Sequence, residues 1–255
     1  MIYIGTSGFS YDDWVGTYYP ATMKKEDWLA FYAREFNALE VNYTYYRMPT
    51  ARTLAGMARK VPPGFLFSVK TPQEMTHTRQ ADAQLFAQFT DALKPLIEQE
   101  HFGAVLAQFP FSFHNIPSNV DYLKQFAERL NDVPTVVEFR DAQWLTDQTF
   151  ALVRELGLGF CCVDEPRLKG LLPPIAEATS NVAYVRFHGR NAAKWWEHAQ
   201  AYERYDYTYP KAELEEWTPK IRKLNQLAET VFVFANNHYR AQGIDTARQL
   251  RLLLE

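Results

Sequence analysis

The chain alternates short apolar runs with longer amphipathic segments, and this alternation limits its fold more than any other feature. Eight runs have the length and composition of β-strands, and they cover residues 2–5, 38–41, 65–69, 103–109, 135–139, 159–163, 182–188 and 231–234. Helical segments separate nearly all of them, which is the pattern of a parallel sheet joined by crossover helices. Eight such units in 255 residues predict a single (β/α)8 TIM barrel over residues 1–255.

The expected helices cover residues 24–35, 50–60, 82–100, 118–130, 147–156, 211–227 and 245–254. Residues 164–181, between the sixth and seventh runs, show no strong helical pattern, so this crossover is expected to be irregular. No segment has the composition of a linker between two domains. A doubly wound open sheet is the competing architecture, because it uses the same alternation of strands and helices.

Composition excludes several classes of protein. The formal net charge of −3 and the pI of about 6.1 give no overall attraction to nucleic acid or to an anionic membrane, so any anion site must be local. Cys161 and Cys162 are adjacent and would point to opposite faces of a strand, which argues against a disulfide between them. Neither a signal peptide nor an apolar run of about 20 residues is visible. We therefore expect a cytoplasmic protein without a membrane partner.

Side chains alternate between the two faces of a strand, so residues i and i+2 share a face. When this alternation is applied to the eight runs, one face of most strands becomes polar at its carboxyl end, and the opposite face stays apolar. The residues expected to meet there are Glu40, Asn42, Lys70, Gln108, Glu138, Arg140, Asp164, Arg186, His188, Asn236 and His238. Active sites of TIM barrels lie at this carboxyl-terminal mouth, so these residues form the candidate site.

The ends of the seventh and eighth runs carry the best candidates for anion binding. Arg186 is followed by Gly189 and Arg190, and Asn236 by Asn237. TIM barrels frequently hold a phosphate group with the loops after these two strands, and an arginine can bind it through two hydrogen bonds. Arg186, Arg190, Asn236 and Asn237 are therefore expected to hold a small anionic ligand. For the two asparagines, a simple turn is the competing interpretation.

Four further residues at the predicted mouth suit acid–base chemistry. Glu138 or His188 is expected to move a proton, with Lys70 and Glu40 orienting and polarising the substrate. A lysine at a strand end can also form a Schiff base if its pKa is low. The carboxylates nearby are expected to raise the pKa of Lys70 instead, so acid or anion-binding roles are favoured over the Schiff base.

Two other interpretations of these charges stay open. Glu40, Glu138 and Asp164 could simply neutralise Lys70, Arg140 and Arg186 as a structural plug. Glu138, Asp164, His188 and His238 are of types that bind zinc, manganese or iron. However, Arg140 and Arg186 on the same face would repel a divalent ion, and no HxH or HExxH spacing occurs. No cofactor is therefore predicted, and a divalent metal is the less favoured alternative.

Aromatic residues are frequent in the long loops near the predicted mouth. They are Tyr11, Trp14, Tyr43, Tyr45, Tyr46, Trp195, Tyr205, Tyr207 and Tyr209. Such rings can stack a sugar or a base, or they can pack the loops onto the barrel rim. Rim packing is the favoured role for most of them, while Tyr11, Trp14 and Tyr207 are counted among the candidate binding residues.

Seven short motifs together resemble the YecE-like family, a domain of unknown function. They are I-G-T-S-G-F-S-Y at 4–11 with Trp14, E-V-N at 40–42, F-S-V-K at 67–70, Q-F-P at 108–110, V-E-F-R at 137–140, R-F-H-G-R at 186–190 with Y-D-Y at 205–207, and N-N-H at 236–238. The resemblance implies a TIM barrel and carries no established activity. Kinship with metal-dependent sugar isomerases and with endonuclease-IV-like enzymes has been suggested for the family, but this chain lacks the His, Glu and Asp set of a trinuclear zinc nuclease.

The favoured hypothesis is an enzyme, of lyase, isomerase or hydrolase type, that acts on a small phosphate-bearing substrate by acid–base chemistry at the barrel mouth. One alternative is a protein that binds nucleic acid or cleaves phosphodiesters, with the loop aromatics stacking bases; the net charge argues against it. A metal-dependent sugar isomerase is another alternative. The last is a non-catalytic barrel that serves a partner protein, for which a paired polar interior without a cavity would be expected.

Overall fold

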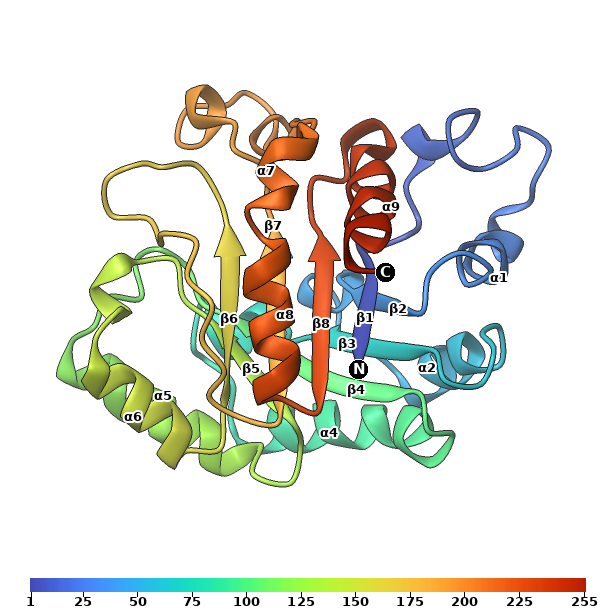
Figure 1. The fold of residues 1–255 in the computed structure, drawn as a ribbon. Helices are drawn as coiled ribbons and strands as arrows, with labels where there is room; N and C mark the ends of the chain where they lie inside the picture. Colours follow the sequence, from blue (N-terminus) through green and yellow to red (C-terminus); the bar gives the residue numbers. More distant parts are fainter.

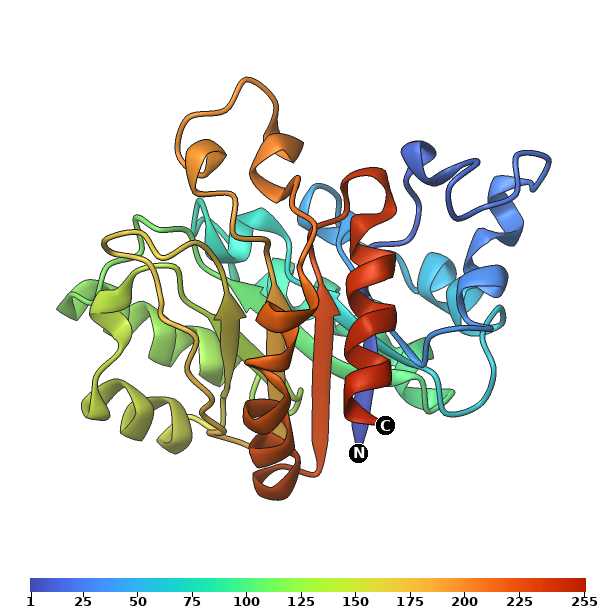
Figure 2. The same ribbon diagram turned by 45° about the horizontal axis from the view of Figure 1, so that its top comes forward.

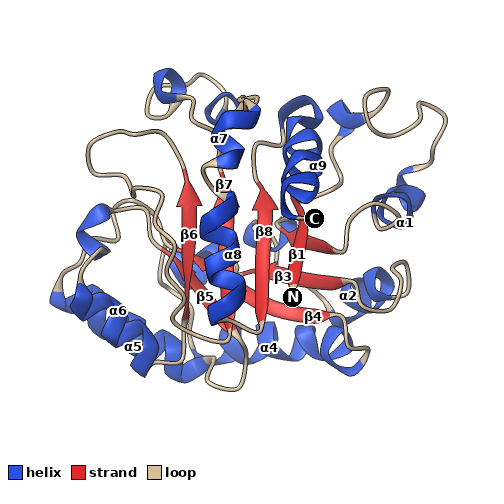
Figure 3. Cartoon of the chain, viewed as in Figure 1, coloured by secondary structure: helices blue, strands red, loops and turns tan.

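A computed structural model describes residues 1–255, apart from the side chain of Ala201. Eight parallel strands close into a barrel in the order of the sequence, with helices around the outside (Figures 1 and 3). The strands are β1 (Ile2–Ser7), β2 (Ala38–Val41), β3 (Leu66–Lys70), β4 (Phe102–Gln108), β5 (Thr135–Glu138), β6 (Gly159–Asp164), β7 (Val182–Phe187) and β8 (Thr230–Ala235). Because β1 pairs with β8, the sheet is closed, which confirms the predicted TIM barrel and excludes the open sheet.

The α-helices are α1 (Trp28–Tyr32), α2 (Ala51–Ala58), α3 (Gln73–Thr76), α4 (Ala83–Glu98), α5 (Pro117–Arg129), α6 (Asp147–Glu155), α7 (Lys211–Glu215), α8 (Thr218–Leu227) and α9 (Gln242–Leu254). Short 3-10 helices are η1 (Asp12–Trp14), η2 (Lys25–Asp27), η3 (Tyr43–Tyr45), η4 (Ala142–Trp144), η5 (Ala192–Lys194), η6 (Ala201–Tyr205) and η7 (Tyr239–Ala241). The predicted helix over 211–227 is two helices, α7 and α8. Residues 165–181 contain no helix, so the prediction of an irregular crossover before β7 is confirmed.

The helices follow from local sequence and from burial. Side-chain oxygens of Asp82 and Thr146 accept hydrogen bonds from backbone N–H groups in the first turns of α4 and α6, which satisfies donors that a helix start leaves free. The buried face of α4 includes Phe86, Phe89 and Leu93. Burying each such side chain contributes roughly 1.5–3 kcal/mol. Among the described residues, no helix combines the length and the apolar character needed to cross a membrane.

The alternation of side chains matches the prediction in seven strands and is opposite in β6. Cys161 is aligned with Tyr184 of β7, and Asp164 with Phe187. Aligned residues on neighbouring strands point to the same side of a sheet, and Tyr184 contacts Glu40 inside the barrel. Cys161 therefore points inward. Asp164 points outward, so the prediction that it faces the mouth is wrong.

Asp164 is the centre of an outer cluster that attaches the segment after β7 to the outside of the barrel. Its carboxylate accepts hydrogen bonds from Tyr209 Oη and Trp217 Nε1, both at 2.7 Å. Arg190 donates two more, from Nε at 2.8 Å and from Nη2 at 2.7 Å. Four donors thus satisfy one buried carboxylate, which explains how a charge is tolerated in this layer.

Removing the centre of the outer cluster is expected to be far more costly than removing a charge at its edge. Asp164→Ala leaves Arg190, Tyr209 and Trp217 without their buried acceptor and should lower the free energy of unfolding by about 3–5 kcal/mol. Glu216→Ala removes a carboxylate that also pairs with Arg190 but is 49% exposed, and should cost less than about 1 kcal/mol. Chemical denaturation of both variants checks this, and equal losses would contradict the central role of Asp164.

Candidate functional site

A cavity of about 650 Å³ opens at the carboxyl ends of the strands. The segment between β7 and α7, which contains η5 and η6, lies beyond the ends of β6 and β7 (Figure 2), and its residues 195–205 supply part of the cavity wall. The charged lining residues are all cations, namely Lys70, Arg140, Arg186 and Arg204. Three histidines also line the cavity, namely His77, His198 and His238. Within the part of the chain that the structure describes, no Asp or Glu lines it.

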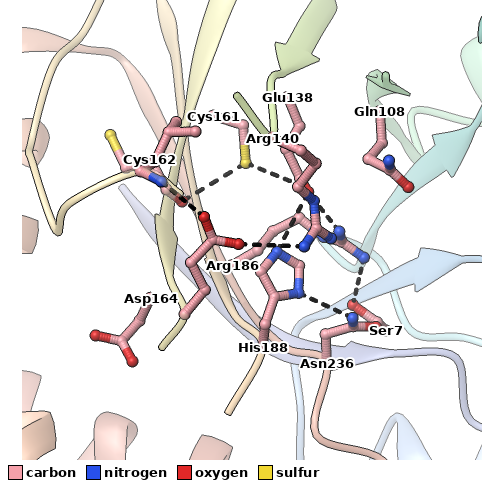
Figure 4. Close-up of polar contacts among 12 residues, drawn as sticks. Ser7, Gln108, Glu138, Arg140, Cys161, Cys162, Asp164, Arg186, His188 and Asn236 are labelled. Atoms are coloured by element: carbon pink, nitrogen blue, oxygen red, sulfur yellow. Dashed lines mark hydrogen bonds and ion pairs between the residues drawn. The ribbon is translucent and has the colours of Figure 1, made fainter. Parts of the chain in front are cut away.

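The floor of the cavity is a buried ion-pair network around Arg186 (Figure 4). Its guanidinium lies between two carboxylates: Glu40 accepts from Nη2 at 2.6 Å and from Nε at 2.9 Å, and Glu138 accepts from Nη1 at 2.7 Å. The Tyr184 hydroxyl donates to Glu40 at 2.8 Å, and Nη2 also reaches Ser7 Oγ at 3.3 Å. Four of the five N–H hydrogens of Arg186 therefore have a hydrogen-bond acceptor.

Arg140 connects this floor to the cavity wall. Its Nε lies 2.6 Å from Glu138 Oε1, and its Nη1 donates to Glu165 Oε2 at 3.2 Å. The guanidinium also lies 5.8 Å from the centre of the Trp195 ring. Burial raises the pKa of Glu165 to about 7, while Arg140 opposes this rise. Glu165 was not predicted as a site residue, because the alternation assigned to β6 was out of phase by one residue.

His188 lies between Glu138 and Asn236 and is held neutral. Its Nε2 is 3.2 Å from Glu138 Oε1, and its Nδ1 is 3.0 Å from the amide nitrogen of Asn236. Burial first, and Arg140 second, lower the pKa of His188 to about 3. Burial alone would raise the pKa of Glu138, but Arg140 and Arg186 lower it well below its ordinary value. At neutral pH this pair is an ionised carboxylate beside a neutral imidazole.

Of the four cations that line the cavity, Lys70 is the one whose positive charge is least stabilised by its surroundings. Its Nζ donates to Gln108 Oε1 at 2.9 Å and lies 4.6 Å from the centre of the Tyr45 ring. Burial, followed by the charge of Arg186, lowers the pKa of Lys70 to about 7. The prediction that the pKa of Lys70 is raised is wrong: Glu40 and Glu138 act to raise it, but burial and the charge of Arg186 outweigh them.

The structure brings most of the predicted site residues together, in two layers. Glu40, Glu138 and His188 form the buried layer, and the lining includes Tyr11, Asn42, Lys70, Gln108, Arg140, Arg186, Asn236 and His238. Tyr11 stacks on His238 with ring centres 4.6 Å apart. Arg204 and His77 also line the cavity and were not predicted, since both lie beyond strand ends, where the alternation gives no information.

Five of the predicted binding residues do not line the cavity. Asp164 and Arg190 belong to the outer cluster, and Arg190 is further paired with Glu213 and Glu216. Arg190 and Asn237 were wrongly predicted because both lie past the ends of their strands, where the alternation of a strand no longer determines which way a side chain points. The other three residues have structural partners: Asn237 donates to Tyr207 O and Thr246 Oγ1, Tyr207 donates to Glu213, and Trp14 is fully buried and donates to His238 O.

The donor set does not fit a divalent metal. Among the residues described, no three His, Cys, Asp or Glu side chains converge in a way that could hold a metal ion. Both carboxylates of the floor already neutralise Arg186, so a metal would have to displace a guanidinium from them.

The neutral state of His188 predicts a distinct loss of stability in acid. The unfolded chain takes up a proton at this histidine below pH 6.5, whereas the folded chain does so only near pH 3. Its contribution is therefore full above pH 6.5 and is lost as the pH falls toward 3. Replacing His188 by Gln should reduce the loss of unfolding free energy between pH 7 and pH 4.5 by about 2 kcal/mol. Urea denaturation at several pH values checks this, and parallel curves for both proteins would refute it.

Comparisons with known proteins agree with this fold and extend over the whole chain. A model of the family described as "Protein of unknown function DUF72" matches residues 3–255. The UPF0759 protein YunF of Bacillus subtilis is 31% identical over 275 residues, covering 100% of this chain and 95% of that protein.

Two solved structures of DUF72 family proteins are also similar. The Thermotoga maritima protein has a TM-score of 0.92 and 40% identity, covering 100% of this chain and 99% of that one. For an Enterococcus faecalis protein the TM-score is 0.88 and the identity 27%, covering 100% and 95%. These matches confirm the resemblance seen in the motifs: the chain belongs to the DUF72 family of TIM-barrel proteins, whose function is unknown.

Proposed function

We propose that the barrel mouth binds a small anionic molecule that carries a flat or apolar part, and that the protein is an enzyme acting on it. The observation that carries this proposal is the charge of the lining, which has four cations and no carboxylate among the described residues. Like charges at one wall repel each other, so an anion that neutralises them is stabilised there. The volume of about 650 Å³ suits a molecule of metabolite size.

Three of the four cations keep the most capacity for a ligand. Arg186 already donates four hydrogen bonds, to Glu40, Glu138 and Ser7, so its main role is to organise the floor. Arg140 uses Nε and Nη1 for carboxylates, which leaves Nη2. Lys70 and Arg204 have no carboxylate within 4 Å in the described part of the chain. Guanidinium groups bind phosphate and carboxylate groups through paired hydrogen bonds.

Aromatic side chains dominate the rest of the wall and support a flat or apolar part in the ligand. They are Tyr11, Tyr45, Tyr46, Phe111, Trp195, Trp196, Tyr202 and Tyr205. The guanidinium groups of Arg140 and Arg204 both lie near the Trp195 ring, at 5.8 and 5.5 Å from its centre. Rings that are buried beside cations offer both stacking area and charge, which favours an aromatic or sugar-like anion.

Lys70 is the group best suited to move a proton. A pKa of about 7 gives comparable amounts of its acid and base forms at neutral pH, which is the condition for effective acid–base catalysis. Glu138 is held ionised by two arginines, and His188 is kept neutral in the same buried layer. The two groups first expected to carry protons therefore serve better as fixed parts of the electrostatic environment.

The other functional classes receive less support. The isomerase and phosphodiester-cleaving alternatives rely on metal ligands, and the carboxylates of the floor are committed to arginine. A non-catalytic barrel needs a paired interior but has no use for a cationic cavity above it. Acid–base chemistry on a small anion uses both layers of the site.

Phenyl phosphate combines a phosphate with a flat ring and is the simplest probe of this proposal. It should bind saturably and more tightly than inorganic phosphate, while phenol should not bind measurably. Arg204→Gln removes a guanidinium that has no carboxylate partner among the described residues and uses only Nε, for Trp195 O, and it should weaken phenyl phosphate binding about 10-fold or more. Arg222→Gln, an exposed arginine on α8, is the matched control and should leave binding unchanged. Isothermal titration calorimetry measures each; no binding of phenyl phosphate to the native protein, or equal losses in both variants, would overturn the proposal.

A further inference from the structure

Lys70 has the position of a nucleophile in the wall of the cavity. It is the last residue of β3, so its backbone is fixed by the barrel, while its amine lines the cavity. Gln108 of the adjacent strand β4 accepts one hydrogen bond from Nζ at 2.9 Å. In the described part of the chain, no carboxylate lies within 4 Å of this amine. An amine without an acidic partner is free to lose its proton and to present a lone pair.

The groups around Lys70 favour its neutral form. The charged and titratable side chains that act on it from the neighbouring elements are Glu40 on β2, Tyr45 in η3, His77 after α3, Glu138 and Arg140 at the end of β5, and Arg186 on β7. Both carboxylates are bound to Arg186, and burial with the two guanidiniums outweighs them. With a pKa of about 7, about half of the amine is unprotonated at neutral pH, against less than about 0.1% for an ordinary lysine.

We propose that Lys70 attacks an aldehyde or ketone group of the anionic ligand and forms an imine with it. This inference rests on the proposed function and names the substrate class as a carbonyl compound that carries a phosphate or carboxylate group. The amine nitrogen adds to the carbonyl carbon, and a carbinolamine forms after proton transfer. Loss of water then leaves the C=N bond, so condensation releases one water and needs no oxidant or reductant. A lysine in a desolvated, cation-rich site is an effective nucleophile of this kind.

Two neighbours orient the amine for this step. The amide nitrogen of Gln108 donates to Phe109 O at 2.7 Å, which directs its oxygen toward Lys70. Tyr45 presents its ring 4.6 Å from Nζ, and a ring face stabilises the positive charge of a protonated imine. Gln108 and Tyr45 are therefore positioning residues, and Lys70 is the catalytic residue.

Pyridoxal 5′-phosphate tests the inference, because it combines an aldehyde, a flat ring and a phosphate. The protein is incubated with this compound, reduced with borohydride and mapped by peptide mass spectrometry. Lys70 should be labelled at least about 10-fold faster than exposed lysines at pH 7, since far more of its amine is neutral. The labelling rate should rise with pH and level off above a midpoint near 7. Pyridoxal, which lacks the phosphate, should label Lys70 much more slowly, and phenyl phosphate should compete with the labelling.

Lys70→Arg keeps the charge without the nucleophile, and it should lose the adduct while still binding phenyl phosphate. Lys124→Arg on α5 is the control and should keep the adduct. Labelling of the native protein only at exposed lysines would overturn the inference even if the variant fails to fold. Phenyl phosphate binding without an adduct at Lys70 would refute the imine and leave the proposed function standing, whereas absence of both would refute the two together.

Discussion

The buried ion pair between Arg186 and two glutamates is the interaction on which the rest of the site depends. One guanidinium lies at the centre of a closed barrel, 2.6 Å from Glu40 and 2.7 Å from Glu138. Carboxylates from β2 and β5 are thereby held by a side chain from β7, across the barrel interior. Such a network is a weak source of stability, because the desolvation of each charge offsets most of the attraction. Its more important consequence is that both carboxylates are withdrawn from the cavity above.

Because Arg186 binds both carboxylates, the charged groups that line the cavity above are all cations. Arg140 shares Glu138 with Arg186 and also binds Glu165. Its remaining nitrogen is left for the cavity, and its guanidinium lies over the Trp195 ring in the cavity wall. Lys70 receives no carboxylate at all within 4 Å in the described chain, and its pKa falls. The same set of charges would behave as an inert plug if Glu40 reached Lys70. The layered arrangement instead separates a neutralised floor from a cationic wall.

Much of this arrangement could be predicted from strand alternation, and its failures have physical causes. Seven strands carry a polar residue on one face and apolar residues on the other, so their phase is readable. In contrast, β6 reads G-F-C-C-V-D and is buried on both faces, as strands of parallel barrels are, so Asp164 alone suggested the phase and misled by one residue. Because of this error, Glu165 was not predicted as a site residue, and Asp164 was predicted to face the barrel mouth. Beyond the strand ends, alternation is no longer enforced by pairing: it still placed Arg140 and His188, but Arg190 and Asn237 were misplaced and Arg204 was not found.

The pKa of Lys70 illustrates a limit that no pattern in the sequence removes. Two glutamates on the same inward face favour a high pKa if each is taken as a free neighbour of the lysine. The outcome is reversed because burial of the amine, followed by the charge of Arg186, lowers the pKa more than the two glutamates raise it. Arg186 also holds both glutamates, with three hydrogen bonds. Which cation binds which carboxylate depends on side-chain reach across the barrel, which only coordinates supply. The reactivity of Lys70 is therefore a property of the whole ion-pair network and not of any motif that contains this residue.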